Sequence, residues 1–428
     1  MTETLVFTMR AMGAVVDVFA GPGVSSRLIE TLVSAWTDCE ACPAPEPSPP
    51  RNPEHVSIVL ATRQNPVPAT TVGSREVPVL TVDADVPRVA QEFTSLVTLE
   101  LIRRHIGRTH LFHAAALMQP GTGQVVALVG PSGRGKTTAS RALARAGWVY
   151  LSDETCAIDP ETLAVLPYPK PLSIIAKPAE PKTQIAASAL GLRHHDPASP
   201  VRPELARLVV LDRLDAGTRP HEDAAARGLR CLPLLESLQV LAEQSSGLAR
   251  TRDGLLRLAE LADRIGGVDA VTYTDSSQLP ELLADSLETR RDAGVEPWKY
   301  IAGSAPGEPA GHDLPSSDLP GPVVPEPKGS ERLYSRSVET CGIVTDHGML
   351  LMHPERTVIY SELGADLWIE AGDGRTRHHL EERLSEIYGP PPPGAFDVVL
   401  DTILEDGGLV VSNPPGTASP PTDPEEQP

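Results

Sequence analysis

The sequence predicts an α/β core with a mixed sheet and flanking helices, built around a glycine-rich loop and followed by a second, small α+β domain. Two observations support this division of the 428 residues. An apolar β-branched run over residues 125–129 leads into the loop and then into a helical pattern that stops at Gly147. Residues 303–330 are rich in Gly, Pro, Ser and Asp, which is typical of a linker between two folded units.

The loop runs from Gly130 to Thr137 and fits the pattern G-x-x-x-x-G-K-[ST], which needs a strand before it and a helix after it. Its glycines let successive N–H groups point at phosphate oxygens, and the helix start adds its positive dipole end. We expect Lys136 to reach the β- and γ-phosphates of ATP and the Thr137 hydroxyl to hold Mg²⁺. An ordinary glycine turn is the alternative, which both flanking elements disfavour. The candidate nucleotide-binding residues are Gly130, Ser132, Gly133, Arg134, Gly135, Lys136, Thr137 and Thr138.

Composition limits the partners. The net charge of −20 and the pI near 5.0 disfavour a nucleic acid or an anionic membrane surface, because no Lys/Arg stripe is left to bind phosphates. No apolar run is long enough to span a bilayer, and the N-terminus lacks the pattern of a signal peptide, so we expect a cytoplasmic protein. Cys39 and Cys42 form a C-x-x-C, but no second pair follows at zinc-site spacing, which disfavours a metal or redox role.

The first predicted domain covers residues 1–302, with an N-terminal α/β portion over 1–108 and the loop-containing core over 109–302. In the N-terminal portion we expect strands at 4–7, 14–19, 56–61 and 79–82 and helices at 25–36 and 86–106. The second of these helices has an apolar face made by Val89, Phe93, Leu96, Leu99 and Ile102. No chemical motif falls in this portion. In the core we expect further strands at 111–117, 148–154, 205–211 and 268–273 and helices at 232–241, 254–265 and 280–290.

Polar side chains follow or interrupt the strands next to the glycine loop. Asp153 and Glu154 end the predicted strand over 148–154, where a carboxylate at the end of a parallel strand holds Mg²⁺ or positions a nucleophile. On an extended strand the two cannot point the same way, so one should face the metal and the other a neighbour or solvent. His113 lies in an apolar run and is either a hydrogen-bonded core residue or a catalytic candidate. Lys170 and Lys177 are either second cations for the γ-phosphate or surface lysines.

The second predicted domain covers residues 331–413, and the Pro/Glu-rich tail over 414–428 should be disordered. Strand candidates at 333–338, 349–352 and 357–360 precede helical patterns at 363–371, 377–388 and 396–405. Three strands and three helices in about eighty residues are winged-helix-like in outline. Winged helices often bind DNA, but this domain lacks a basic recognition helix.

The core resembles the HPr serine kinase superfamily, and specifically its peptide-cluster relatives. The resemblance is carried by His113-Ala-Ala, the G-P-S-G-x-G-K-T loop, Leu151-Ser-Asp153-Glu154, Pro167-Tyr-Pro-Lys170-Pro-Leu and Asp269-Ala-Val-Thr-Tyr273. It implies a kinase that moves phosphate from a nucleoside triphosphate to a serine-type hydroxyl, with Asp153 as the base. No segment matches the signature that supports reverse phosphorolysis in true HPr kinases.

The second domain resembles a PqqD-type domain, the leader-recognition element of ribosomally made, modified peptides. The resemblance rests on residues 359–368, Gly374-Arg-Thr376, Leu380 with Leu384, and 397–400 leading to Gly408-Leu409. It implies that a leader peptide adds as a strand beside 357–360 and packs against the helix near 396–404, which is β-augmentation. The peptide-binding residues implied are Thr357, Val358, Ile359, Tyr360, Val399 and Ile403.

Together these features predict an ATP-dependent kinase that phosphorylates a serine-type hydroxyl of a ribosomally synthesised precursor peptide. ATP and Mg²⁺ are the expected cofactors; Lys136, Asp153 and His113 are the candidate catalytic residues, and Thr137, Asp153 and Glu154 the candidate Mg²⁺ ligands. Other enzymes that modify the same peptide are further candidate partners. Two alternatives stay open: a small-molecule kinase for serine or a sugar, and a non-catalytic chaperone that uses nucleotide as a switch.

Overall fold

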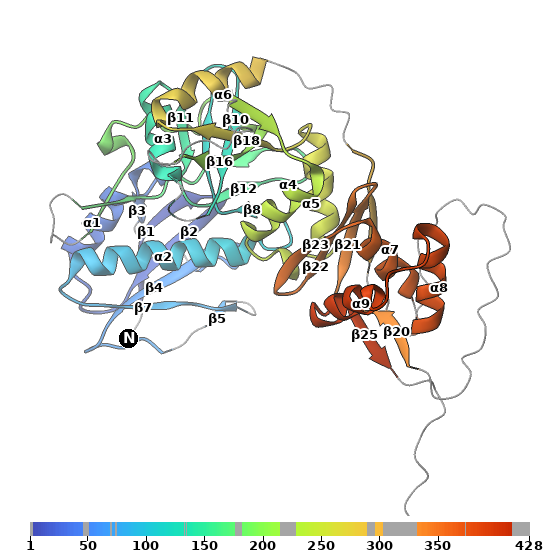
Figure 1. Ribbon diagram of the computed structural model, residues 1–428. Coiled ribbons are helices and arrows are strands. Elements are labelled where there is room, and N and C mark those ends of the chain that lie inside the picture. Colours follow the sequence, from blue (N-terminus) through green and yellow to red (C-terminus); the bar gives the residue numbers. More distant parts are fainter. Residues whose placement is uncertain are drawn as a thin grey trace, which may run out of the picture. The chain divides into compact units, whose positions relative to one another are not determined.

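The computed structural model divides the chain into two compact units, Met1–Val295 and Glu296–Pro428 (Figure 1). Each unit is described by itself. The structure describes residues 3–45, 51–68, 71–72, 75–131, 133, 135–175, 182–214, 228–288, 296–302, 332–372 and 374–412. The predicted linker, the predicted tail, Ser132, Arg134 and Lys177 lie outside these residues, as does Glu331.

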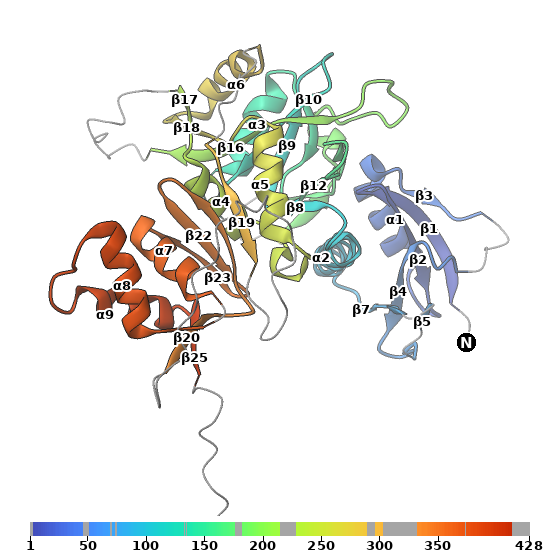
Figure 2. The same cartoon turned by 90° about the vertical axis from the view of Figure 1, so that its right-hand side faces the viewer.

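The first unit begins with a five-stranded sheet of order β3-β1-β2-β4-β7. Figure 2 looks along the long helix α2, which packs with α1 on this sheet. Their hydrophobic core also includes Leu111 and Ala157, which belong to a separate three-stranded sheet. Of the apolar face predicted for α2, Leu99 is instead 44% exposed, while Val97 and Leu101 are buried. The elements are β1 (Thr4–Ala11), β2 (Ala14–Ala20), α1 (Ser26–Ala35), β3 (Cys42–Pro43), β4 (Val56–Thr62), β7 (Val79–Val82) and α2 (Val86–His105), with a small hairpin of β5 (Thr71–Val72) and β6 (Arg75–Glu76).

A six-stranded sheet of order β11-β9-β10-β16-β18-β17 carries the glycine loop. Strands β10, β16 and β18 are parallel to one another, and β9 runs antiparallel between β10 and β11. Helices α3 and α6 pack on one face of this sheet through a shared core that includes Leu143 and Leu283. The elements are β9 (Ala114–Met118), β10 (Gln124–Val129), α3 (Lys136–Arg145), β11 (Val149–Ser152), β16 (Glu204–Arg213), β17 (Gly228–Cys231), α4 (Leu234–Glu243), α5 (Gly254–Arg264), β18 (Asp269–Tyr273) and α6 (Leu279–Glu288).

The strand predicted over 111–117 is broken at His113. Residues before the break form β8 (His110–Phe112), which pairs with β12 (Cys156–Ile158), whereas those after it form β9 in the six-stranded sheet. At the break the main-chain N–H of His113 donates to the carbonyl of Gln244 at 2.7 Å, outside either ladder. The apolar run therefore contributes one strand to each of two sheets. The remaining strands are β13 (Val165–Leu166), β14 (Leu172–Ile174) and β15 (Thr183–Ile185).

The second unit combines a four-stranded sheet of order β19-β21-β22-β23 and a three-stranded sheet of order β24-β20-β25 with three helices. Its first strand, β19 (Lys299–Ala302), lies before the predicted linker, so the predicted domain boundary at 302 is wrong: β19 pairs with β21 of the second unit. Strand β21 was also not predicted. The other elements are β20 (Leu333–Arg336), β21 (Cys341–Thr345), β22 (Gly348–His353), β23 (Arg356–Tyr360), α7 (Glu362–Ala371), β24 (Arg375–Thr376), α8 (Arg377–Tyr388), α9 (Ala395–Glu405) and β25 (Leu409–Ser412).

No helix among the described residues is both long and apolar enough to cross a membrane.

Candidate functional site

The glycine loop joins the buried strand β10 to helix α3, which is the context that its sequence pattern requires. Gly133 and Gly135 have φ of +84° and +93°, a backbone region that side chains with a Cβ rarely adopt. Helix α3 begins at Lys136, directly after the second of these glycines. Its unpaired N–H groups therefore face the loop, where the helix dipole favours an anion.

Lys136 is only 7% exposed, and its ammonium lies inside the loop. The Nζ atom donates to the carbonyl oxygens of Gly130 and, at 3.2 Å, Pro131. Burial lowers the pKa of Lys136 and the charge of Glu154 acts in the opposite direction. The ammonium thus sits among main-chain groups at the place where phosphate oxygens of a nucleotide would lie.

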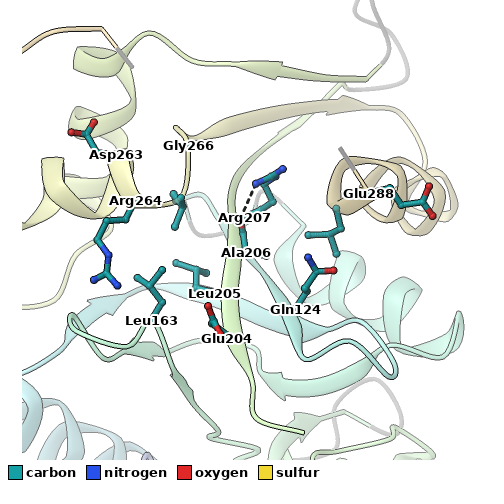
Figure 3. A pocket seen from close by; sticks show the side chains of 12 residues that line it. Gln124, Leu163, Glu204, Leu205, Ala206, Arg207, Asp263, Arg264, Gly266 and Glu288 are labelled. Atoms are coloured by element: carbon teal, nitrogen blue, oxygen red, sulfur yellow. Dashed lines mark hydrogen bonds between the residues drawn. The ribbon is translucent and has the colours of Figure 1, made fainter. Parts of the chain in front are cut away.

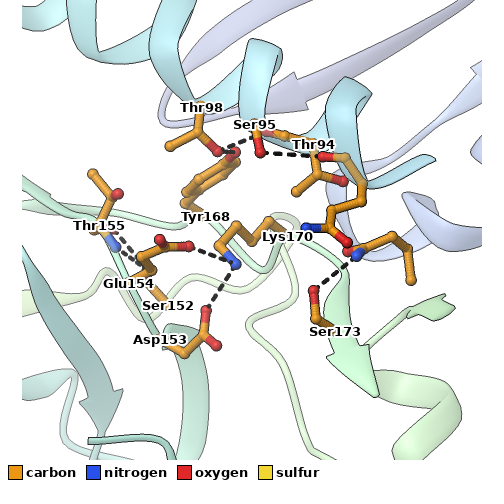
Figure 4. A network of polar contacts seen from close by, with 12 residues as sticks. Thr94, Ser95, Thr98, Ser152, Asp153, Glu154, Thr155, Tyr168, Lys170 and Ser173 are labelled. Carbon is orange, nitrogen blue, oxygen red and sulfur yellow. Dashed lines mark hydrogen bonds and ion pairs between the residues drawn. The ribbon is translucent and has the colours of Figure 1, made fainter. Parts of the chain in front are cut away.

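Asp153 and Glu154 lie at the same edge of the sheet as the loop, because β11 runs in the same direction as β10 with the antiparallel β9 between them. The prediction that the two carboxylates face opposite ways is wrong. Lys170 Nζ is 3.4 Å from Asp153 Oδ1 and 3.0 Å from Glu154 Oε2 (Figure 4). The chain has left the strand by Asp153 and turns there, with the Ser152 hydroxyl donating to the Thr155 carbonyl at 2.6 Å, so strand alternation does not apply.

Lys170 is a buried residue rather than a surface lysine, with 6% exposure. It follows Tyr168, whose hydroxyl lies 2.8 Å from the Thr98 hydroxyl of α2 (Figure 4). Burial alone would lower the pKa of Lys170, but the carboxylates of Asp153 and Glu154 raise it. For Glu154 burial raises the pKa and Lys170 more than offsets that effect, so the pKa is lowered. Lys170 and Glu154 are therefore both charged at neutral pH.

His113 faces the same cavity from the break between β8 and β9. Burial and the nearby charge of Lys136 lower its pKa, while the carboxylates of Glu154 and Asp153 act against this shift. The net lowering favours a neutral imidazole at pH 7, which donates one hydrogen bond from one ring nitrogen and accepts one at the other.

These side chains line one cavity of about 470 Å³. It brings together Lys136, Thr137, Thr138, Asp153, Glu154 and His113, as expected from the sequence, but Gly130 does not line it. Sequence reasoning missed Arg141, Leu172 and Ser173; Arg141 lies on the second turn of α3, a position that helical spacing from Thr137 would have indicated. The full lining is His113, Gly133, Gly135, Lys136, Thr137, Thr138, Arg141, Asp153, Glu154, Lys170, Leu172 and Ser173.

The donor set fits Mg²⁺, which prefers oxygen ligands and keeps several waters or phosphate oxygens. Thr137 contributes a hydroxyl, and Lys170 engages only one oxygen of each carboxylate, so Asp153 and Glu154 each keep a second oxygen. Within the described ranges no group of three or more His, Cys, Asp or Glu side chains gathers at metal-binding distance. A metal here would thus depend on the nucleotide for much of its coordination.

In the second unit, β23 is an edge strand of the four-stranded sheet, as β-augmentation requires. Ile359 is 39% exposed, and Thr357 and Val358 are half-buried. Tyr360 and Ile403 are buried in the hydrophobic core, which contradicts their assignment as peptide contacts. The Tyr360 hydroxyl instead donates to Asp406 at 2.6 Å and ties β23 to the end of α9. Val399 packs half-buried against the same core.

Comparisons with known proteins add little to this geometry. No family model matches the chain, and no curated protein matches it. Among solved structures, the chain is similar to the HPr(Ser) kinase/phosphatase from Coxiella burnetii, with 14% sequence identity over 42% of this chain and 93% of that chain and a TM-score of 0.22. A TM-score this low carries no argument about fold or function. The resemblance of the second unit to PqqD-type domains stays a prediction.

Proposed function

We propose that this chain is an ATP-dependent kinase that phosphorylates a serine-type hydroxyl of a ribosomally synthesised precursor peptide. The observation that carries the proposal is the cavity beside the glycine loop, where Lys136, Thr137, Asp153 and Lys170 converge. A loop that suits phosphates lies next to a carboxylate that suits a hydroxyl proton, which is the pairing that phosphoryl transfer needs.

In the proposed reaction the acceptor oxygen forms a bond to the γ-phosphorus while the bond from that phosphorus to the β–γ bridging oxygen breaks. ADP leaves, and the hydroxyl proton passes to Asp153. The N–H groups at Gly135 and Lys136, together with the Lys136 ammonium, stabilise the charge on the phosphates. Bound Mg²⁺ would neutralise phosphate charge and would be held by Thr137 and one of the two carboxylates.

Lys170 supports this chemistry by fixing the carboxylates. Its buried ammonium holds one oxygen of Asp153 and one of Glu154, which leaves the second Asp153 oxygen to meet the acceptor. A base whose orientation is set in advance loses less entropy when the substrate binds. Lys170 is therefore a positioning residue in this proposal.

The peptide substrate is proposed from the second unit. The open edge of β23 offers main-chain hydrogen bonds to an extended leader, and Ile359 offers an exposed apolar side chain beside them. Buried Tyr360 shapes this edge from inside through its hydrogen bond to Asp406. On α9, Val398 is exposed and Val399 half-buried, so both offer apolar surface to a peptide.

The tether between the units is shorter than the sequence suggested. Residues 303–331 connect β19 to β20 within the second unit, so the covalent connection between units runs from Glu288, the end of α6, to Lys299, the start of β19. The ten residues between them span at most about 35 Å. A leader docked on the second unit would thus keep the rest of the peptide at a raised local concentration near the loop.

Mass spectrometry of a precursor peptide incubated with the protein, ATP and Mg²⁺ tests the proposal. We expect one added phosphate group on a hydroxyl side chain and loss of the product when the leader is removed. Phosphorylation of free serine or a sugar, with no reaction of the peptide, would favour a small-molecule kinase. ATP binding with no transfer to any hydroxyl would favour a nucleotide-switched chaperone.

A further inference from the structure

Two side chains outside the cavity lie against the glycine loop from its other side. Arg213 ends β16 and Tyr273 ends β18, and the two residues are register partners on adjacent parallel strands. Their side chains therefore lie on the same face of the sheet. A Cβ atom at Gly135 would lie 3.2 Å from the Tyr273 hydroxyl oxygen and 3.8 Å from Arg213 Cδ. Both side chains thus approach the residue that precedes Lys136.

Neither polar group has a partner that explains its position. Tyr273 is 2% exposed, and its buried hydroxyl makes no hydrogen bond. Arg213 is exposed, and within the part of the chain that the structure describes no carboxylate forms an ion pair with it, although its charge is one of the smaller causes that lower the pKa of Asp275. Buried polar groups in folded proteins are satisfied as a rule, so a hydroxyl left unsatisfied at a loop of this type indicates a ligand or a ligand-bound loop conformation.

The strand order gives the loop two distinct sides. Asp153, Glu154, Lys170 and His113 all come from the β9 and β11 side of β10, whereas Arg213 and Tyr273 come from β16 and β18 on the opposite side. In the proposed kinase the γ-phosphate must meet Asp153. The remainder of the nucleotide then extends in the other direction, over the carboxyl ends of β16 and β18, where ligands of open parallel sheets bind.

We propose that Arg213 and Tyr273 form the nucleoside end of the nucleotide site. The Arg213 guanidinium binds the α-phosphate, and the Tyr273 hydroxyl forms a hydrogen bond to the main chain at Gly135 once the loop holds phosphate. This assignment rests on the proposed function, since Asp153 defines which end is the γ-phosphate. Arginine suits the role because its planar fork donates two parallel hydrogen bonds to phosphate oxygens. It also gives the triphosphate a fixed direction across the loop.

Binding of ATP and of pyrophosphate, each with Mg²⁺, to the full chain tests the assignment by calorimetry. Pyrophosphate carries two phosphates, enough for the β- and γ-positions between Lys136 and Asp153, but none for the α-position. We expect Arg213→Ala to weaken ATP binding roughly ten- to hundredfold and pyrophosphate binding less than about twofold, and Tyr273→Phe to weaken the binding of both ligands roughly threefold, because its hydrogen bond forms whenever the loop holds phosphate. Arg145→Ala, which removes an exposed arginine from the far end of α3, is the matched control and should change neither affinity.

Equal losses of ATP and pyrophosphate binding in Arg213→Ala would overturn the assignment, because they would place Arg213 on the phosphates nearer Asp153. Unchanged ATP binding in both variants would also overturn it. Tyr273→Phe keeps the ring in the core, and circular dichroism with thermal unfolding shows whether each variant folds. If the wild-type chain binds ATP but transfers no phosphate, the kinase proposal fails while a selective loss in Arg213→Ala still supports the nucleoside end.

Discussion

Two cavities lie at opposite ends of the same parallel strands, and the larger one is not the candidate site. The cavity at the amino ends of β10 and β16 has a volume of about 590 Å³, against about 470 Å³ for the one beside the glycine loop. Both contain charged side chains (Figure 3). Size and charge alone therefore do not separate them.

The difference lies in what the charges are bound to. At the amino ends, Arg207 donates to the carbonyl of Ala206 at 3.1 Å (Figure 3) and to that of Ser286 at 3.1 Å. Arg264 donates to the carbonyls of Pro160 and Glu161. These arginines satisfy main-chain groups where chain segments meet. At the carboxyl ends, Lys170 is held between two acids and the loop presents main-chain N–H groups, so the charges converge on a space for a ligand. The convergence of charged and polar groups on one space, rather than the volume of the cavity, therefore distinguishes the candidate site at the carboxyl ends of the strands.

The largest expected effect comes from the proposed base. Asp153→Asn keeps the size of the side chain but removes its ability to accept the proton, so phosphate transfer should fall by roughly 10²- to 10⁴-fold. ATP binding should stay close to wild type, since the loop is unchanged. A radiolabel transfer assay and nucleotide calorimetry measure the two quantities.

Glu154→Gln serves as the comparison for that variant, because Glu154 is the neighbouring acid on the same ammonium. We expect a smaller loss of transfer in Glu154→Gln than in Asp153→Asn. Near-normal turnover of Asp153→Asn together with an inactive Glu154→Gln would move the role of base to Glu154.

Lys170 provides a stability test of the same cluster. Lys170→Met keeps the apolar stem but leaves two carboxylates side by side, which should lower the free energy of unfolding at pH 7 by about 2 kcal/mol, less than for a fully buried pair because Glu154 is half-exposed. Urea unfolding measures the change. Adding Glu154→Gln should restore part of the lost stability, and a double variant no more stable than Lys170→Met would argue against the ion-pair explanation.

Much of the loop region follows from local sequence, whereas the rest of the site does not. The glycine pattern, the β-branched strand before it and the helix after it are short-range features, and the structure confirms them. The partners of Lys170 were not predicted, because they depend on a proline-flanked turn that meets Asp153 only in the folded chain. Arg213 and Tyr273 are 60 residues apart and meet only through strand pairing.

The second unit shows the same limit. Periodicity identified α9 and β23 but not which of their side chains face the core, so Tyr360 and Ile403 were assigned to a peptide and are instead buried. Strand β19 has four residues and precedes a Gly/Pro-rich segment, so no local signal tied it to β21. Such assignments require the tertiary contacts themselves.

A docking variant tests whether the second unit acts on substrate binding alone. Ile359→Asp places a charge on the exposed side of the β23 edge and should raise KM for the full-length precursor by roughly tenfold, with kcat and the reaction of a leaderless acceptor unchanged. The control is Ile387→Asp, the same substitution at an exposed isoleucine of α8. Steady-state kinetics on both acceptors measures the effect, and equal KM changes in the two variants would remove β23 from the docking surface.

The smallest effects should come from Arg264, which lines the cavity at the amino ends, and from His110, which lies outside that cavity but feels the charge of Arg264. Burial, with smaller contributions from Arg257 and Arg264, lowers the pKa of His110 to about 4. A histidine with a depressed pKa in the folded state costs stability as pH falls from about 6.5 towards 4, by up to about 2 kcal/mol at pH 4.5, so His110→Phe should flatten the acid side of the stability profile. Arg264→Ala should raise the His110 pKa slightly, seen by NMR titration, and leave ATP binding and phosphate transfer unchanged. A loss of transfer in Arg264→Ala would show that this cavity, and not only the one beside the loop, takes part in function.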